Sequence, residues 1–189
     1  GLKLFKRADA RIFYGRSREI FDLCYKITRQ DKPRLLLLDG YSGTGKSSLL
    51  QAGLIPRVER QGWTVAYRRR EEDKINGLKG VFELLLNDVA AAPANQKLLI
   101  LDQVEEAVTD RIEDLPEELD ELAAAIDNAL RQHPNYKFIL GFRSEQMARI
   151  AKVLEKRRLV FDDQNTLYPL DLIGAVEAIS GAANDPSLK

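Results

Sequence analysis

The residues best suited to chemistry form a glycine-rich run, GYSGTGKS, from Gly40 to Ser47. The run matches the phosphate-loop pattern G-x-x-x-x-G-K-[ST] in full. Its glycines let backbone N–H groups converge on phosphate oxygens, Lys46 brings a positive charge to the outer phosphates, and Ser47 offers a hydroxyl to Mg²⁺. We therefore predict a site for ATP or ADP with Mg²⁺. The predicted nucleotide contacts in this run are Gly40, Ser42, Gly43, Thr44, Gly45, Lys46, Ser47 and Ser48.

Acidic residues and an arginine follow apolar runs farther along the chain. Asp102 comes directly after four apolar residues. Because parallel strands end at the same edge of a sheet, we expect its carboxylate beside the phosphate loop, where it would hold Mg²⁺ directly or through a water. Glu105 and Glu106 follow one turn later, and either is a candidate to polarise a water for attack on the γ-phosphate. Arg143 follows the apolar run 136–142 and is suited to contact the γ-phosphate.

These residues need a scaffold, and the hydrophobic pattern predicts alternating strands and helices. Strands are expected at 35–38, 63–67, 98–102, 136–142 and 165–168. Helices are expected at 16–29, 46–61, 81–91 and 117–132, around Met147, Ile150 and Leu154, and after Asp171. Gly53 and Pro56 should bend or shorten the helix after the phosphate loop. The order predicts an α/β protein: a three-layer P-loop NTPase fold with a mainly parallel sheet of about five strands and helices on both faces.

The composition narrows the function classes. Lys plus Arg and Asp plus Glu number 29 each, so the net charge is zero and nucleic acid is disfavoured as a partner. Cys24 is the only cysteine, which excludes an internal disulfide. The longest apolar runs are strand-sized and no secretory signal opens the chain, so we expect a cytoplasmic protein without a membrane span. The chain opens without methionine and ends soon after a new helix begins, so we expect it to be part of a longer protein.

Several segments resemble the STAND-class P-loop NTPases, and within that class the bacterial novel STAND branch related to AP-ATPases and NACHT proteins. The segments that carry the likeness are 13–16, 40–56, 101–106, 141–144 and 167–170. The continuation S-S-L-L-x-A-G-L-x-P after the phosphate loop and the block D-Q-x-E-E are much more specific than the loop alone.

The resemblance implies where the base of the nucleotide lies. It implies base contacts for Phe13, Tyr14, Gly15 and Arg16, and it makes Pro169 similar to a proline that closes over adenine. Residues 1–168 would then be the NTPase core with an N-terminal adenine-contacting segment. Residues 169–189 would be the start of a truncated helical lid subdomain.

The resemblance also implies roles around the γ-phosphate. Asp102 resembles the Mg²⁺ acid, and Arg143 resembles the family's sensor arginine. Glu106 is similar in position to the water-polarising glutamate, with Glu105 close behind. One departure concerns the base-contacting segment, because the family usually has glutamate where this chain has Ser17.

An ATP-driven molecular switch is the function that the resemblance implies. In this hypothesis slow hydrolysis resets the switch within a larger bacterial signalling or defence protein, with protein partners or self-assembly through flanking domains. A kinase that uses Arg68, Arg69 and Arg70 for an acceptor phosphate is one alternative, and a non-hydrolysing nucleotide-binding assembly module is another. A GTPase is disfavoured because no N-K-x-D motif occurs, and a DNA-acting ATPase is disfavoured by the zero net charge.

Overall fold

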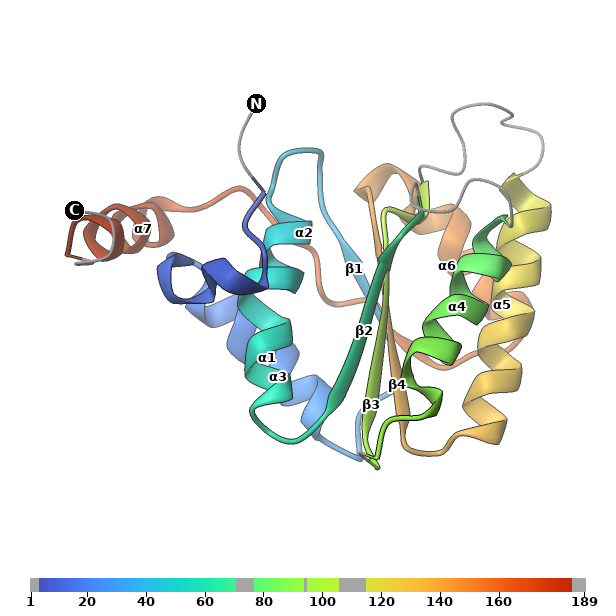
Figure 1. The fold of residues 1–189 in the computed structure, drawn as a ribbon. Coiled ribbons are helices and arrows are strands. Elements are labelled where there is room, and N and C mark those ends of the chain that lie inside the picture. The colour runs from blue at the N-terminus through green and yellow to red at the C-terminus, as the bar shows by residue number, and fades with distance from the viewer. Residues whose placement is uncertain (1–3, 71–76, 94, 106–114, 185–189) are drawn as a thin grey trace.

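The computed structural model describes residues 4–70, 77–93, 95–105 and 115–184 of the 189-residue chain. Figure 1 shows a central sheet with helices on both of its faces. The elements in chain order are η1 (Arg7–Ile12), α1 (Ser17–Thr28), β1 (Leu35–Asp39), α2 (Lys46–Ser48), η2 (Leu49–Leu54), α3 (Ile55–Glu59), β2 (Thr64–Arg69), α4 (Gly77–Ala90), β3 (Lys97–Asp102), α5 (Leu115–Gln132), β4 (Tyr136–Phe142), η5 (Ser144–Gln146), α6 (Met147–Lys156), β5 (Phe161–Asp162) and α7 (Leu172–Asn184). Within these ranges, no helix combines the length and the apolar character needed to cross a membrane.

Five parallel strands form the sheet in the order β2-β3-β4-β1-β5. The central strands are apolar on both sides because helices cover both faces. In β1, Leu35 and Leu37 belong to the buried cluster that contains α4, α5 and α6, whereas Leu36 and Leu38 belong to the one that contains α1, η2 and α3. Alternate side chains therefore feed two cores on opposite faces of one sheet. The predicted three-layer α/β fold is confirmed.

The register of the sheet decides which groups meet at its carboxyl edge. Strand β4 lies between β1 and β3: Leu38 of β1 is paired with Gly141, and Leu101 of β3 is paired with Leu140. The phosphate loop follows β1, and Asp102 ends β3. The loop and this acid are thus separated by one strand, and β4 sets the distance between them.

The helix after the phosphate loop continues through α2, η2 and α3, and its middle part, η2, is a π-helix. The N–H of Ile55 donates to the Leu50 carbonyl, one residue farther back than in an α-helix. Pro56 follows and has no N–H to donate. The guanidinium of Arg57 donates to the carbonyl of Gly53 at 2.6 Å. The disturbance expected at Gly53 and Pro56 therefore takes the form of a wide turn.

The prediction of a strand at 165–168 is wrong. The fifth strand is β5, and within 165–168 only Thr166 forms a bridge, with Asp39. The side-chain amide of Asn165 donates to the carbonyl of Leu37 at 3.0 Å. A side chain thus takes the acceptor that a regular strand would reach with its backbone, so the ladder stops after β5.

Helix α4 spans Gly77–Ala90 and so includes residues before the predicted range of 81–91. Gly77 and Gly80 both lie within these bounds. The N–H of Leu78 donates at 3.1 Å to the carboxylate of Glu118, which belongs to α5. Because this acceptor comes from a distant element, the local sequence does not reveal that the helix includes these residues.

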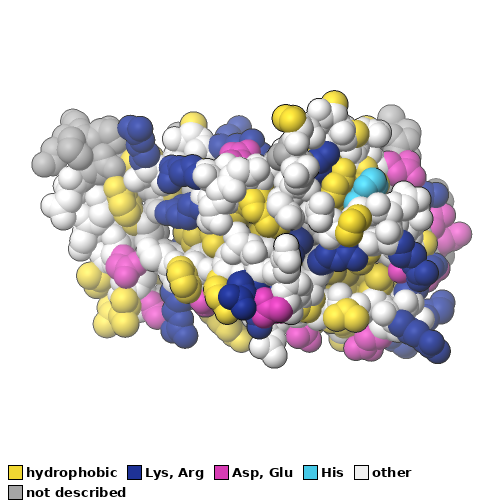
Figure 2. Space-filling view, turned by 90° about the horizontal axis from the view of Figure 1, so that it is seen from below, with side chains coloured by type: hydrophobic (Ala, Val, Ile, Leu, Met, Phe, Trp, Pro, Cys, Tyr) yellow, Lys and Arg dark blue, Asp and Glu magenta, His cyan; other side chains and the backbone are white. Residues whose placement is uncertain are grey.

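Cations meet helix C-termini at the sheet edge opposite the phosphate loop. Lys97 donates to a carbonyl near the end of α4, Lys137 to two carbonyls at the end of α1, and Arg34 to two at the end of α5. Each cation faces the negative end of a helix dipole. Figure 2, which views the molecule from this edge, shows basic and acidic side chains interspersed over the surface, in keeping with the zero net charge.

Lys137 is expected to make the stability of the fold depend on pH. Its side chain is buried, and burial lowers the pKa of its ammonium to about 8, although the nearby negative charge of Asp31 acts to raise it. An unfolded lysine has a pKa of about 10.4, so between these values the unfolded chain binds more protons and the free energy of unfolding rises with pH. The neutral amine still has an N–H for each of its two carbonyl partners.

Urea denaturation of the unmutated chain and of Lys137→Met at pH 7 to 10 measures this contribution. The variant should be less stable throughout, because two carbonyls lose their donor, and its deficit should widen as the pH rises. Lys79→Met, at an exposed lysine of α4, is the matched control and should keep the unmutated pH dependence. If the free energies of unfolding of the unmutated chain and of Lys137→Met changed with pH in parallel, Lys137 would not be the source of the pH dependence.

Candidate functional site

The phosphate loop joins the end of β1 to the start of α2. Gly43 and Gly45 have φ values of +81° and +91°, in the left-handed region that side chains disfavour. A Cβ built on either residue meets nothing within 4 Å, so the backbone conformation, and not crowding, requires glycine here. The space left free above the loop is where the N–H groups of a phosphate loop meet phosphate oxygens.

Lys46 is 9% exposed and lies across the mouth of the loop. Its Nζ donates to the carbonyl of Gly40 at 2.5 Å and to that of Tyr41 at 3.3 Å. Burial lowers the pKa of this ammonium, while the carboxylates of Glu105 and Asp102 act in the opposite direction. The lysine is therefore held close to the loop backbone, in reach of any anion that the loop takes up.

Asp102 lies beside the phosphate loop and is fully buried at the end of β3. Its Oδ2 accepts a hydrogen bond from Ser47 Oγ at 2.6 Å and from Tyr67 Oη at 2.7 Å. Its Oδ1 accepts from the N–H of Gln103 at 2.9 Å.

The described residues hold no group of three or more His, Cys, Asp or Glu side chains suited to a metal ion. One carboxylate and one hydroxyl form an oxygen set that suits Mg²⁺ bound mainly by phosphates and water.

Two residues of this cluster received no role from the sequence. Tyr67 donates to Asp102, and its burial together with that carboxylate raises the pKa of the phenol, so it stays a donor. Gly141 faces the same carboxylate from β4: a Cβ there would lie 2.6 Å from Asp102 Oδ1. A glycine inside an apolar strand is a known signal of close approach, so Gly141 was detectable from sequence. Tyr67 carried no such signal.

Glu105 and Arg143 close the other side of the site. Glu105 Oε1 lies 3.4 Å from Arg143 Nε, and the arginine is half exposed. Only 9% of the glutamate side chain is exposed, and its Oε2 is buried without a hydrogen-bond partner. Burial accordingly raises the pKa of the Glu105 carboxyl. This is the environment of a group able to take up a proton. Glu106, the other predicted candidate, lies outside the described residues.

A cavity of about 220 Å³ brings these groups together. Its lining contains loop residues, the acidic segment after β3 and the arginine after β4, so three sequence-predicted segments share one space. The residues that line it are Leu4, Ser42, Gly43, Gly45, Lys46, Ser47, Ser48, Gln103, Glu105 and Arg143.

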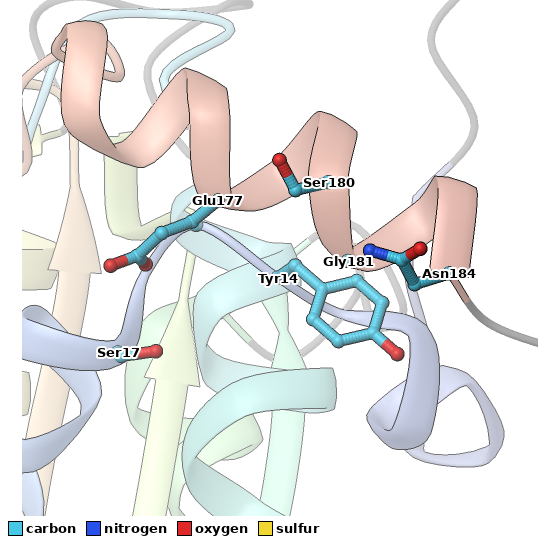
Figure 3. A pocket seen from close by; sticks show the side chains of 7 residues that line it. Tyr14, Ser17, Glu177, Ser180, Gly181 and Asn184 are labelled. Atoms are coloured by element: carbon cyan, nitrogen blue, oxygen red, sulfur yellow. The ribbon is translucent and has the colours of Figure 1, made fainter.

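The segment predicted to contact the base divides between two environments. Tyr14 and Gly15 line a cavity of about 560 Å³ between this segment and α7, in which Tyr14 lies along the helix near Gly181 (Figure 3). Gly15, Arg16 and Pro169 line a neighbouring cavity of about 430 Å³. Both are large enough for a ligand such as a nucleobase. Phe13 instead packs against Phe5, with ring centroids 5.5 Å apart.

The arginine run considered for a kinase acceptor site is engaged in contacts within the fold. Arg68 binds both carboxylate oxygens of Asp88 at 2.8 and 2.9 Å. Arg69 donates to the side chain of Gln103, and Arg70 lies 3.4 Å from Glu118. These contacts tie β2 to its neighbours.

Comparisons with known proteins agree with this fold. A Walker-type ATPase of Pyrococcus abyssi is similar over 100% of this chain and 63% of its own length, with a TM-score of 0.59 and 18% identity. DnaA of Aquifex aeolicus, solved with bound AMPPCP, is similar over 90% of this chain and 50% of its own, with a TM-score of 0.52 and 15% identity. At these identities the likeness concerns the fold alone, and the chain spans less than two thirds of either protein. No curated protein matches it.

The family comparison is more specific. The model of the family described as Novel STAND NTPase 1 matches residues 1–189. The match includes the phosphate loop, the acidic segment after β3 and the arginine after β4, which the fold assembles around one cavity. The chain is a nucleotide-binding NTPase domain of the STAND type, and it belongs to the Novel STAND NTPase 1 family.

Proposed function

We propose that this chain is an ATP- and Mg²⁺-binding switch domain that hydrolyses ATP slowly within a larger bacterial signalling or defence protein. The observation that carries the proposal is the convergence of Lys46, Ser47 and Asp102 at the carboxyl edge of the sheet. The Aquifex aeolicus DnaA structure, which shares the fold, holds an ATP analogue. We also propose that residues from Pro169 onward begin a mobile lid subdomain.

Each part of the site has a separate task in this proposal. The loop N–H groups and Lys46 bind the phosphates, and Ser47 and Asp102 would hold Mg²⁺. When bound, this ion neutralises charge on the β- and γ-phosphates. Tyr67 and the Gln103 N–H keep the Asp102 carboxylate in one orientation by donating to its two oxygens. Arg143, which follows β4 and lines the same cavity, would contact the γ-phosphate.

Glu105 is our candidate for the base that accepts a proton from the attacking water. Its unpartnered buried Oε2 and raised carboxyl pKa support this role, and it lines the same cavity as Lys46 and Ser47. Glu106 keeps the role that the family resemblance implies for it until the two are compared. Water attack would form a P–O bond at the γ-phosphorus and break its bond to the oxygen that bridges the β- and γ-phosphates, so that ADP and phosphate leave and the glutamate holds the proton of the water.

Glu105→Gln and Glu106→Gln decide between these bases. The variant that lacks the base should bind ATP as the unmutated chain does and lose hydrolysis by about 100-fold or more. Glu105→Gln should also melt at a higher temperature, because an amide is cheaper to bury than a carboxylate. Calorimetry with ATP, an ADP-release assay and thermal melts give the three readouts, and Glu121→Gln, at an exposed position of α5, is the control.

Undiminished hydrolysis in both variants would contradict the use of either glutamate. Tight ATP binding without any turnover by the unmutated chain, even in its full-length assembly, would favour the non-hydrolysing binding module instead.

A further inference from the structure

Arg16 is a buried charge that donates hydrogen bonds to three acceptors within the fold. It is 7% exposed, and its Nη2 donates to two backbone carbonyls, those of Thr44 and Tyr168, both at 2.9 Å. Its Nη1 donates to Glu19 Oε1 at 2.5 Å. One guanidinium thus joins the phosphate loop to the segment that leads into α7.

On the loop side, Arg16 holds the residue between the two left-handed glycines. Thr44 is 8% exposed, and its Oγ1 donates to the Tyr41 carbonyl at 2.9 Å, which closes the turn. The peptide between Thr44 and Gly45 carries both the carbonyl that Arg16 binds and an N–H of the phosphate-binding turn. Any rotation of this peptide toward a phosphate must therefore also move the acceptor of Arg16.

On the other side, Arg16 holds the chain just before α7. The preceding residues are attached to β1, because the Leu167 N–H donates to the Asp39 carbonyl at 2.7 Å and Thr166 Oγ1 donates to the Asp39 carboxylate at 2.8 Å. From Tyr168 onward the chain leaves the sheet, and the Arg16 contact is made at this point of departure.

The residue before Arg16 contacts α7 itself. A Cβ on Gly15 would lie 2.4 Å from the carbonyl oxygen of Gly174, and a Cβ on Gly174 would lie 2.7 Å from the Gly15 carbonyl oxygen. Such separations leave room only for glycine on both sides, so the two backbones are in direct contact. Gly15 and Arg16 together form one joint between α7 and the phosphate loop.

We propose that Arg16 is a positioning residue that couples the state of the phosphate loop to the position of α7. The coupling runs from the Thr44 carbonyl through the guanidinium to the Tyr168 carbonyl, with Glu19 fixing the orientation of the fork. A planar guanidinium suits this task because its N–H groups bind several acceptors in fixed directions. The inference rests on the proposed function, since it requires that the loop bind a nucleotide.

Hydrogen exchange with and without saturating ADP and Mg²⁺ tests the coupling. In the unmutated chain, nucleotide should slow exchange both in residues 40–48 and in α7. In Arg16→Gln, residues 40–48 should still respond at saturation, whereas the response of α7 should be lost. Arg16→Lys keeps the positive charge but lacks the planar guanidinium with its several N–H donors, and it should restore part of the α7 response. Arg149→Gln, at an exposed arginine of α6, should behave as the unmutated chain does.

A full α7 response in Arg16→Gln would overturn the inference, and so would nucleotide protection of residues 40–48 without any response of α7 in the unmutated chain. A lack of ADP binding by the unmutated chain in calorimetry would overturn the proposed function itself. A far-ultraviolet circular dichroism spectrum and a thermal melt of each variant establish that it is folded before exchange is measured. If Arg16→Gln does not fold, Arg16→Lys is used for the test instead.

Discussion

Replacing Lys46 by alanine is expected to weaken the binding of ADP and of a non-hydrolysable ATP analogue by about 100-fold or more. Charged hydrogen bonds to phosphate are among the strongest that a protein makes, and a buried site enhances them. Lys46 belongs to the loop sequence, and its ammonium donates to the loop carbonyls of Gly40 and Tyr41. The substitution leaves Gly43 and Gly45 in place but removes the positive charge of the lysine that follows them.

Calorimetry of the purified variant measures this loss. The fold should survive, because burial already disfavours the charged form of Lys46 and alanine removes that cost. Lys79→Ala deletes an exposed lysine of α4 and should leave affinity unchanged. An unaltered dissociation constant in a folded Lys46→Ala protein would refute nucleotide binding by this loop.

Gly141→Ala is expected to have the second large effect, although this residue lies on β4 and not in the phosphate loop. The added Cβ would lie 2.6 Å from Asp102 Oδ1, and the carboxylate is held by Ser47, Tyr67 and the Gln103 N–H. Relief of the clash must turn the carboxylate and break some of these bonds. We expect a loss of about 1–3 kcal/mol in the free energy of unfolding.

The same change should abolish the enhancement of nucleotide affinity by Mg²⁺ while leaving the affinity measured in EDTA close to normal. Calorimetry with and without the metal separates these effects. In an Asp102→Ala background the clashing oxygen is gone, so Gly141→Ala should cost far less stability there than in the unmutated chain. Additive losses in this double-mutant cycle would show that the two residues do not act through their contact.

The fold was predictable wherever local pattern and final environment agree. The strands at 35–38, 98–102 and 136–142 are continuous apolar runs, and helices cover them on both faces, so their positions were predicted to within one residue. The phosphate loop was predictable because its backbone needs glycine at fixed positions. Asp102 was placed beside the loop on the single assumption that the strands are parallel, and the hydrogen bond to Ser47 is consistent with that placement.

The remaining features depend on partners that are distant in sequence. Glu118 accepts the N–H of Leu78 in α4 from another helix, and Asn165 replaces the backbone of the strand that was predicted there. Tyr67 reaches Asp102 from the neighbouring strand. For Arg16 the sequence provided a role by resemblance. Two of its hydrogen bonds run to backbone carbonyls, which every residue type carries and which sequence therefore does not reveal.

The order of strands in the sheet also has a consequence for how the protein is made. Strand β1 lies between β4 and β5, and Leu35 is paired with Phe138, so the strand that precedes the loop finds these neighbours only after β4 and β5 have been synthesised. Pairing over such a separation is slow because the intervening loop must close first. The nascent chain therefore contains the whole phosphate-binding sequence long before it can bind phosphate, and nucleotide stabilises the product of folding, not its early stages.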